Sequence, residues 1–127
     1  MRNICVYGSL RKGCYNFDRF CGYYPGEITY KETTTIDANY ALFSLGSYPA
    51  LVKSEEKNNI TVDILEVSER AFEALNRMEV GAGYSPVKIN VNDVDCTVWI
   101  YNYKAHPNAK VESGNWVEYL ASKELVY

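Results

Sequence analysis

The sequence has few of the residues that metal sites and disulfide frameworks require. Its 127 residues include four cysteines and a single histidine. No two cysteines stand in a CxxC pair, so the Cys/His spacing of zinc sites is absent. We therefore expect no metal site. Because the start of the sequence lacks the pattern of a secretory signal, we also expect a cytoplasmic protein whose cysteines are reduced thiols.

Two further absences argue against membranes and nucleic acids as partners. No apolar run approaches the ~20 residues that a membrane-spanning helix needs. Thirteen basic residues against sixteen acidic ones give a net charge of −3, whereas a nucleic-acid surface shows a basic excess. The sequence thus indicates neither a membrane protein nor a nucleic-acid-binding protein.

What the sequence does contain is typical of one folded domain. Apolar residues make up 47% and charged residues 23%, which is enough apolar matter for a core and excludes disorder as the main state. The length fits one domain over residues 1–127. Twelve tyrosines are an unusual number. Tyrosine suits both strands and the walls of small-molecule pockets, because it combines apolar bulk with one polar tip.

Hydrophobic periodicity predicts strands interrupted by a few short helices, a pattern typical of a curled mixed sheet in an α+β domain. The predicted strands cover residues 3–7, 33–43, 60–67, 84–91 and 96–103. The predicted helices cover residues 15–21, residues from Ser68 as N-cap to about Glu79, and residues from Ser113 onward.

Connections and helix faces follow from the same patterns. The charged, turn-rich segment 53–59 is expected to be an exposed hairpin loop, and residues 92–95 are expected to form a hairpin turn. Helical spacing predicts one apolar stripe on the second helix, which packs against the core. The stripe consists of Ala71, Phe72, Leu75 and Met78. The last helix carries Trp116, Val117, Leu120 and Ala121.

The first candidate site is the end of the first strand. That strand is expected to stop at Gly8, so the backbone amides that follow are free of the sheet and can converge on an anion or a carbonyl oxygen. Gly8 has no Cβ to keep a ligand from the backbone, and Ser9 can donate a hydrogen bond. Arg11 and Lys12 form a small cationic spot that would favour an anionic ligand. The alternative is an ordinary turn at the end of a strand.

The second candidate is Glu79, between an amphipathic helix and the glycines Gly81 and Gly83. A carboxylate at a helix C-terminus faces an unfavourable dipole, and a partly apolar setting would raise its pKa, as a general acid or base requires. The alternative is a solvated residue at a helix end. His106 lies in a polar segment and is interpreted as a loop residue, so no Ser-His-Asp or Cys-His arrangement is indicated.

Five matches in chain order connect these candidates to a known family. They are residues 6–16 (VYGSLRKGCYN), 46–52 (GSYPALV), 75–79 (LNRME), 84–91 (YSPVKINV), and 98–101 with 113–116 (VWIY and SGNW). The chain resembles the gamma-glutamylcyclotransferase-like family, which includes gamma-glutamylamine cyclotransferases and AIG2-like proteins. The tetrapeptide Tyr-Gly-Ser-Leu alone would be weak, whereas all matches in order over nearly the whole chain are specific.

The sequence departs from the family pattern at three places. Val80 stands where the family has glycine, Pro86 replaces an arginine, and Val62-Asp63 stands where the family has Gly-Glu. These departures leave the resemblance in fold intact and leave the identity of the substrate open.

The resemblance implies a small, closed or nearly closed mixed β-barrel with short helices packed outside. It implies an enzyme that converts a gamma-glutamyl amide or gamma-glutamylamine to 5-oxoproline and a free amine, with Glu79 as general acid/base. This reaction requires no metal and no cofactor. The backbone amides of the first turn would hold the α-carboxylate or the oxyanion, and two tyrosines would wall the pocket. The implied substrate-binding residues are Tyr7, Gly8, Ser9, Leu10 and Tyr84.

Two alternatives stay open beside this interpretation. The same scaffold could bind a metabolite or nucleotide without converting it, because a fold does not determine a function. It could also be an interaction domain whose cavity is vestigial. The oligomeric state is not indicated by the sequence.

Overall fold

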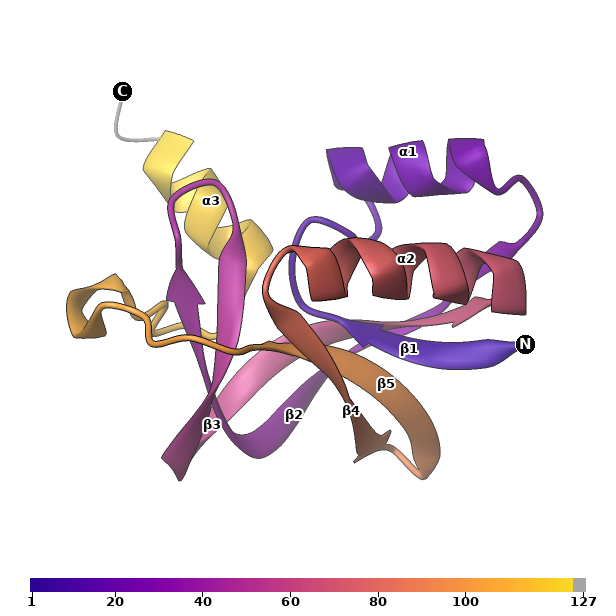
Figure 1. The fold of residues 1–127 in the computed structure, drawn as a ribbon. Helices are drawn as coiled ribbons and strands as arrows, with labels where there is room; N and C mark the ends of the chain where they lie inside the picture. Colours follow the sequence, from indigo (N-terminus) through magenta and orange to yellow (C-terminus); the bar gives the residue numbers. More distant parts are fainter. Residues whose placement is uncertain (125–127) are drawn as a thin grey trace.

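The computed structural model describes residues 1–124 and has the predicted α+β architecture (Figure 1). Its strands form one five-stranded sheet. The elements in chain order are β1 (Arg2–Val6), α1 (Tyr15–Tyr23), β2 (Ile28–Ser44), β3 (Pro49–Val67), α2 (Glu69–Gly81), β4 (Tyr84–Val91), β5 (Val94–Tyr101), the 3₁₀ turn η1 (Pro107–Ala109) and α3 (Trp116–Glu124). None of the helices in this part of the chain is long and apolar enough to span a bilayer.

The sheet is open, so the expected barrel is wrong in this respect. Its strand order is β2-β3-β1-β5-β4. The central strand β1 runs antiparallel to β3 and parallel to β5, and the outer pairs are antiparallel. No ladder joins the edge strands β2 and β4 within residues 1–124. Where a barrel would close, the Asn92 side chain in the β4–β5 turn donates a hydrogen bond to Glu32 of β2 over 3.0 Å instead.

Strand β1 is buried on both faces because the sheet is covered on both sides. Ile4 and Val6 pack into the core beneath α1 and α2, which lie over one face of the sheet (Figure 1). Cys5 packs into the opposite core, which contains the fully buried Trp116 of α3. This arrangement explains why the first strand is a continuous apolar run rather than an alternating one. The four cysteines are unpaired, in agreement with the expected thiols.

The segment 53–59 is not a hairpin loop but part of β3. Ala38 of β2 pairs with Asn58, and Tyr40 pairs with Lys53, so residues 54–57 bulge opposite Asn39. A bulge accommodates extra residues without ending the strand, which is how charged, turn-forming residues fit here. The hairpin turn lies instead at residues 45–48, where Gly46 has φ +96°.

Several helix and turn details differ from the prediction. Helix α2 begins after the predicted cap, where the Ser68 hydroxyl accepts from the Ala71 amide at 3.1 Å, but it continues to Gly81. Met78 is 59% exposed because the core beneath this helix ends at Leu75.

The other two differences lie in the second half of the chain. The β4–β5 turn contains only Asn92 and Asp93, both with positive φ, which matches a two-residue hairpin turn. Helix α3 begins at Trp116 rather than at Ser113, and its Val117 and Leu120 are exposed.

We predict that Gly114→Ala destabilises the fold strongly through a backbone clash. Gly114 has φ +67°, and a Cβ there would lie 1.8 Å from the carbonyl oxygen of Asn59 in β3. The control is Gly26→Ala, since Gly26 has φ +76° but open space around it. We expect Gly26→Ala to lower the free energy of unfolding in urea by about 1–2 kcal/mol, and Gly114→Ala by at least about 3 kcal/mol. Equal losses would show that no close approach is needed at Gly114.

Candidate active site

The turn after β1 is held firmly by its own backbone. The Gly8 carbonyl accepts from the Arg11 amide at 3.1 Å, and the Ser9 carbonyl accepts from the Phe17 amide of α1 at 3.2 Å. The Ser9 hydroxyl oxygen also accepts from the Asn16 side chain at 2.7 Å. The turn therefore has one conformation, connected to the first turn of α1.

The amides of Gly8, Ser9 and Leu10 remain available to a ligand. None of them donates to an acceptor within residues 1–124. Such free, adjacent amides are the groups that bind a carboxylate or a developing oxyanion. Their role in substrate binding stays a prediction.

Gly8 is required for packing, which differs from the expected reason for a glycine. A Cβ at Gly8 would lie 2.5 Å from Cγ of Pro49, the first residue of β3. The Tyr84 hydroxyl in turn donates to the Pro49 carbonyl at 2.7 Å. The sequence analysis predicted that a ligand would approach Gly8 where other residues have a Cβ. The ring of Pro49 occupies that space instead, and Tyr84 of β4 bonds to the carbonyl of this proline.

Both predicted wall residues, Tyr7 and Tyr84, are buried and bonded to main chain. The Tyr7 hydroxyl donates to the Trp99 carbonyl at 2.7 Å and accepts from the Leu51 amide at 3.4 Å. Burial raises the pKa of Tyr84 to about 12 and also raises the pKa of Tyr7 well above its ordinary value, and the nearby Glu79 carboxylate contributes to both shifts. The two phenols stay protonated, and both lie within electrostatic reach of Glu79.

Glu79 lies half-buried in the last turn of α2. Burial raises its pKa from the ordinary 4.5 to about 7. No residue in 1–124 forms an ion pair or hydrogen bond with its carboxylate, and the last turn of α2 has no basic residue. At neutral pH both protonation states are populated, which is the condition for a residue that takes up and returns a proton.

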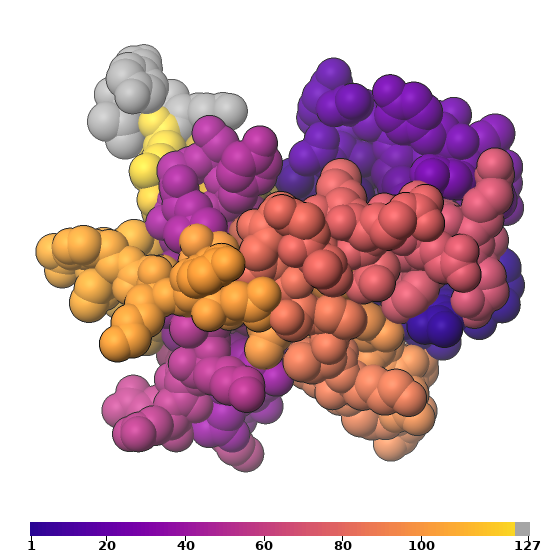
Figure 2. All heavy atoms as spheres, in the orientation of Figure 1, coloured from indigo at the N-terminus to yellow at the C-terminus, as the bar shows by residue number. Residues whose placement is uncertain are grey.

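The structure brings Glu79 within electrostatic reach of Tyr7 and Tyr84, but none of the three lines either of two hollows in residues 1–124. The larger hollow, about 500 Å³, lies at the β3 bulge and includes Tyr40 and Lys53. The smaller, about 210 Å³, lies between β2 and β5. Figure 2 shows a recess between the tip of the β2–β3 hairpin and α1, with the indigo N-terminal segment as its floor.

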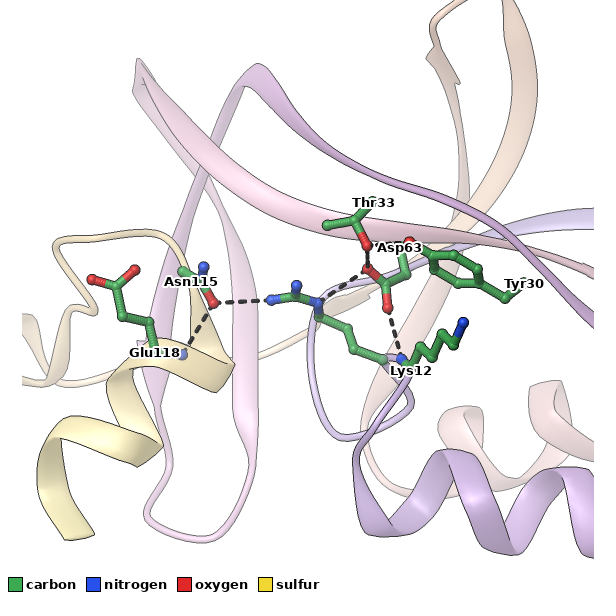
Figure 3. Close-up of polar contacts among 7 residues, drawn as sticks. Lys12, Tyr30, Thr33, Asp63, Asn115 and Glu118 are labelled. Carbon is green, nitrogen blue, oxygen red and sulfur yellow. Dashed lines mark hydrogen bonds and ion pairs between the residues drawn. The ribbon is translucent and has the colours of Figure 1, made fainter. Parts of the chain in front are cut away.

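A buried carboxylate, Asp63 of β3, anchors the first turn (Figure 3). It is 1% exposed. The Lys12 amide donates to its Oδ2 at 2.7 Å, and the Thr33 hydroxyl donates to its Oδ1 at 2.7 Å. The Arg11 guanidinium, also buried, lies 3.3 Å from Oδ1. Asp63 thereby ties β2 and β3 to the turn that carries the free amides.

The same arginine extends this connection to α3. Arg11 donates to Oδ1 of Asn115 at 2.9 Å, and that oxygen also accepts from the Glu118 amide at 3.1 Å, which caps the helix. The expected cationic spot is therefore wrong for Arg11, whose charge is neutralised inside the fold. The second residue of that spot, Lys12, has its Nζ over the ring of Tyr30, 4.5 Å from the ring centre.

One residue outside this group, His106, lies in a loop as the sequence indicates. His106 is exposed, and its Nδ1 accepts from the Asn108 amide at 3.1 Å, which caps η1. No three His, Cys, Asp or Glu side chains in the described part of the chain are arranged to hold a metal. The sequence analysis missed Asp63 as an anchor, although an acid between the apolar residues Val62 and Ile64 was a signal for a buried ion pair.

We predict that Asp63→Asn lowers the free energy of unfolding by about 3–5 kcal/mol, because it leaves the buried Arg11 charge without its partner. The control is Glu69→Gln, which breaks the exposed Arg2–Glu69 pair, 2.8 Å apart, and should cost at most about 1 kcal/mol. Chemical denaturation compares the two variants. A loss at Asp63 no larger than that at Glu69 would contradict the anchoring role.

We further predict that Glu79 makes the fold less stable as the pH rises. Its folded pKa of about 7 lies above the ordinary 4.5, so the folded chain holds this proton more tightly than the unfolded chain. The favourable contribution is complete below about pH 4.5 and is lost as the pH rises through about 7. Between pH 5 and pH 8, Glu79→Gln should lose less stability than the wild type, by on the order of 2 kcal/mol.

The control for this pH effect is Glu73→Gln, an exposed position on the same helix. It should follow the wild-type dependence of unfolding free energy on pH. Parallel profiles for the wild type and Glu79→Gln would mean that Glu79 ionises at its ordinary pKa.

Comparison with known proteins agrees with the fold and the order of motifs. The gamma-glutamyl cyclotransferase, AIG2-like family matches residues 4–118. A Methanocaldococcus jannaschii protein provisionally named gamma-glutamylcyclotransferase is 26% identical over 125 residues, which cover 94% of this chain and 98% of that protein.

Solved structures extend the comparison. The crystal structure of a Pyrococcus horikoshii protein has 26% identity and a TM-score of 0.80, with 98% of each chain covered. That of a mouse AIG2-like protein has 19% identity and a TM-score of 0.70, covers 91% of this chain and 88% of its own, and supports the fold alone. By the match over residues 4–118, the chain belongs to the gamma-glutamyl cyclotransferase, AIG2-like family.

Proposed function

We propose that the protein is a cyclotransferase that converts a gamma-glutamyl amide or gamma-glutamylamine to 5-oxoproline and a free amine. The observation that carries the proposal is the pKa of Glu79, which burial raises to about 7 without a positive partner in residues 1–124. The family match and the name of the Methanocaldococcus relative support the same reaction class.

Glu79 supplies the proton transfers that this cyclisation needs. The substrate α-amine is an ammonium at neutral pH and cannot attack until it loses a proton to the Glu79 carboxylate. Its nitrogen then bonds to the γ-carbonyl carbon, and the bond from that carbon to the leaving nitrogen breaks. Of the three ammonium protons, one stays on the ring nitrogen. Glu79 carries the other two, one at a time, to the leaving amine, which departs as an ammonium ion.

The first turn supplies the electrostatic part of the reaction. Negative charge develops on the γ-carbonyl oxygen as the ring closes, and the amides of Gly8, Ser9 and Leu10 are donors with no acceptor in residues 1–124. Donors fixed in advance stabilise such an oxyanion without reorganising. Alternatively these amides hold the α-carboxylate, which would fold the substrate so that its amine faces the carbonyl.

Tyr7 and Tyr84 serve this site by excluding water and fixing its frame. Their hydroxyl protons are directed at main-chain carbonyls, so neither phenol is free to act as the acid. Burial of Glu79 raises its pKa, and the buried rings of Tyr7 and Tyr84 lie near enough to interact with its charge.

We predict that Glu79→Gln keeps the fold and lowers turnover by at least about 100-fold. The assay measures 5-oxoproline released from gamma-glutamyl amides, and circular dichroism checks the fold. Glu73→Gln on the exposed face of α2 is the matched control and should retain wild-type turnover. Wild-type activity in Glu79→Gln would remove Glu79 from its role. Substrate bound by the wild type but recovered unchanged would favour a binding protein.

A further inference from the structure

Three segments around Glu79 contain no charged residue. They are residues 45–49 (LGSYP), 80–84 (VGAGY) and 99–103 (WIYNY). Charged residues make up 23% of the whole chain, so an uncharged surface made from three separate segments is unusual. Figure 2 shows these regions meeting on one face, where the tip of the β2–β3 hairpin, the end of α2 and the chain after β5 come together.

Specific contacts join the three segments. The Tyr84 hydroxyl donates to the Pro49 carbonyl at 2.7 Å. The Tyr101 ring lies between two others, with its centroid 5.2 Å from that of Tyr84 and 5.5 Å from that of Tyr103. A Cβ on Gly83 would lie 2.9 Å from Cε2 of Tyr103, so this glycine lets the tyrosine lie against the end of α2.

The outer side of this ring stack is exposed. Tyr48 is 62% exposed, Val80 51% and Tyr103 63%; we refer to these three residues as the aromatic rim. Val80 directly follows Glu79, and the Tyr48 phenol lies close enough to Tyr84 to contribute to the raised pKa of that residue. Tyr48 and Tyr103 thus adjoin the buried tyrosines beside Glu79, and exposed apolar side chains gathered at a site indicate binding.

We propose that the aromatic rim binds the amine part of the substrate, and that this amine carries an uncharged aromatic or long apolar group. The inference rests on the proposed cyclotransferase function. Glu79 must reach the leaving nitrogen to protonate it, so the substituent on that nitrogen emerges beside Val80 and its neighbours.

Charge complementarity separates this class of amine from the alternatives. A gamma-glutamyl amino acid releases a group with its own carboxylate, for which the protein would have to provide a basic side chain. A gamma-glutamyl diamine releases a group with a second ammonium, for which the protein would have to provide an acidic side chain. The three segments contain neither, and the next charged residue after Tyr103, Lys104, has an exposed side chain outside them. Glu79 cannot serve as that acid, because pairing with an ammonium would lower the pKa that its proton transfers require.

Four substrates test the inference with the wild-type protein. They are gamma-glutamyl methylamide, gamma-glutamyl phenethylamide, gamma-glutamylphenylalanine and the mono-gamma-glutamyl derivative of 1,4-diaminobutane. The phenethylamide and the phenylalanine derivative differ only in one carboxylate. We expect the highest kcat/KM for the phenethylamide, by about tenfold over each of the other three.

The variants Tyr48→Ala and Tyr103→Ala should each lower kcat/KM for the phenethylamide by about tenfold and leave the methylamide nearly unchanged. Tyr15→Ala and Tyr23→Ala, at exposed tyrosines of α1, are the controls and should change neither substrate. Thermal unfolding shows whether each variant is folded.

Three results would overturn the inference while leaving the proposed function intact. One is equal or better turnover of the charged substrates, and another is an equal loss for both amides in the rim variants. The third is a wild-type dimer, detected by sedimentation, that Tyr103→Ala dissociates without changing kcat/KM, since the rim would then bind a second copy. Failure to convert any of the four substrates would instead contradict the proposed function itself.

Discussion

The buried carboxylate of Asp63 is the constraint on which the site depends. It lies in the longest strand and accepts hydrogen bonds from β2 and from the turn after β1, while its ion pair with Arg11 reaches the cap of α3. Removing two charges from water is unfavourable unless the remaining polar atoms are satisfied. No buried side-chain nitrogen or oxygen in residues 1–124 lacks a partner. This arrangement fixes the geometry of the turn after β1, because hydrogen bonds and the ion pair connect the turn to β3, to β2 through Asp63, and to the cap of α3.

The site combines this turn with a second acid, Glu79, whose surroundings differ from those of Asp63. Asp63 is surrounded by donors, whereas Glu79 has none within residues 1–124 and is simply desolvated. Two carboxylates in one small protein therefore have different surroundings: Asp63 holds structure through its hydrogen bonds and ion pair, and Glu79 is the group proposed to exchange a proton. Pro49 connects the turn to β4, because its ring packs on Gly8 and its carbonyl accepts from the Tyr84 hydroxyl.

Local patterns predicted much of the fold, because short-range physics determines those features. The strand at β1, the Ser68 cap and the last strands follow from periodicity and capping. The sequence could not show that residues 53–59 belong to β3 rather than to a loop. A bulge and a loop use the same residue types. Nor could it show the open sheet, or the packing of Pro49 on Gly8, because both depend on contacts between segments distant in sequence. Glu79 was proposed from its place at the end of an amphipathic helix, whereas its raised pKa follows from burial, which the sequence alone does not show.

The proposed role of Glu79 in proton transfer is tested most directly by measuring the pKa of its carboxyl in the intact protein. Carbon-13 NMR of protein labelled at the glutamate side-chain carboxyls, with Glu79→Gln to assign the resonance, follows its ionisation against pH. We expect the ionisation of Glu79 to have a midpoint near pH 7, well separated from the midpoint of an ordinary glutamate. A midpoint near 4.5 would mean that this carboxyl is solvated like any surface acid and would contradict its role in proton transfer.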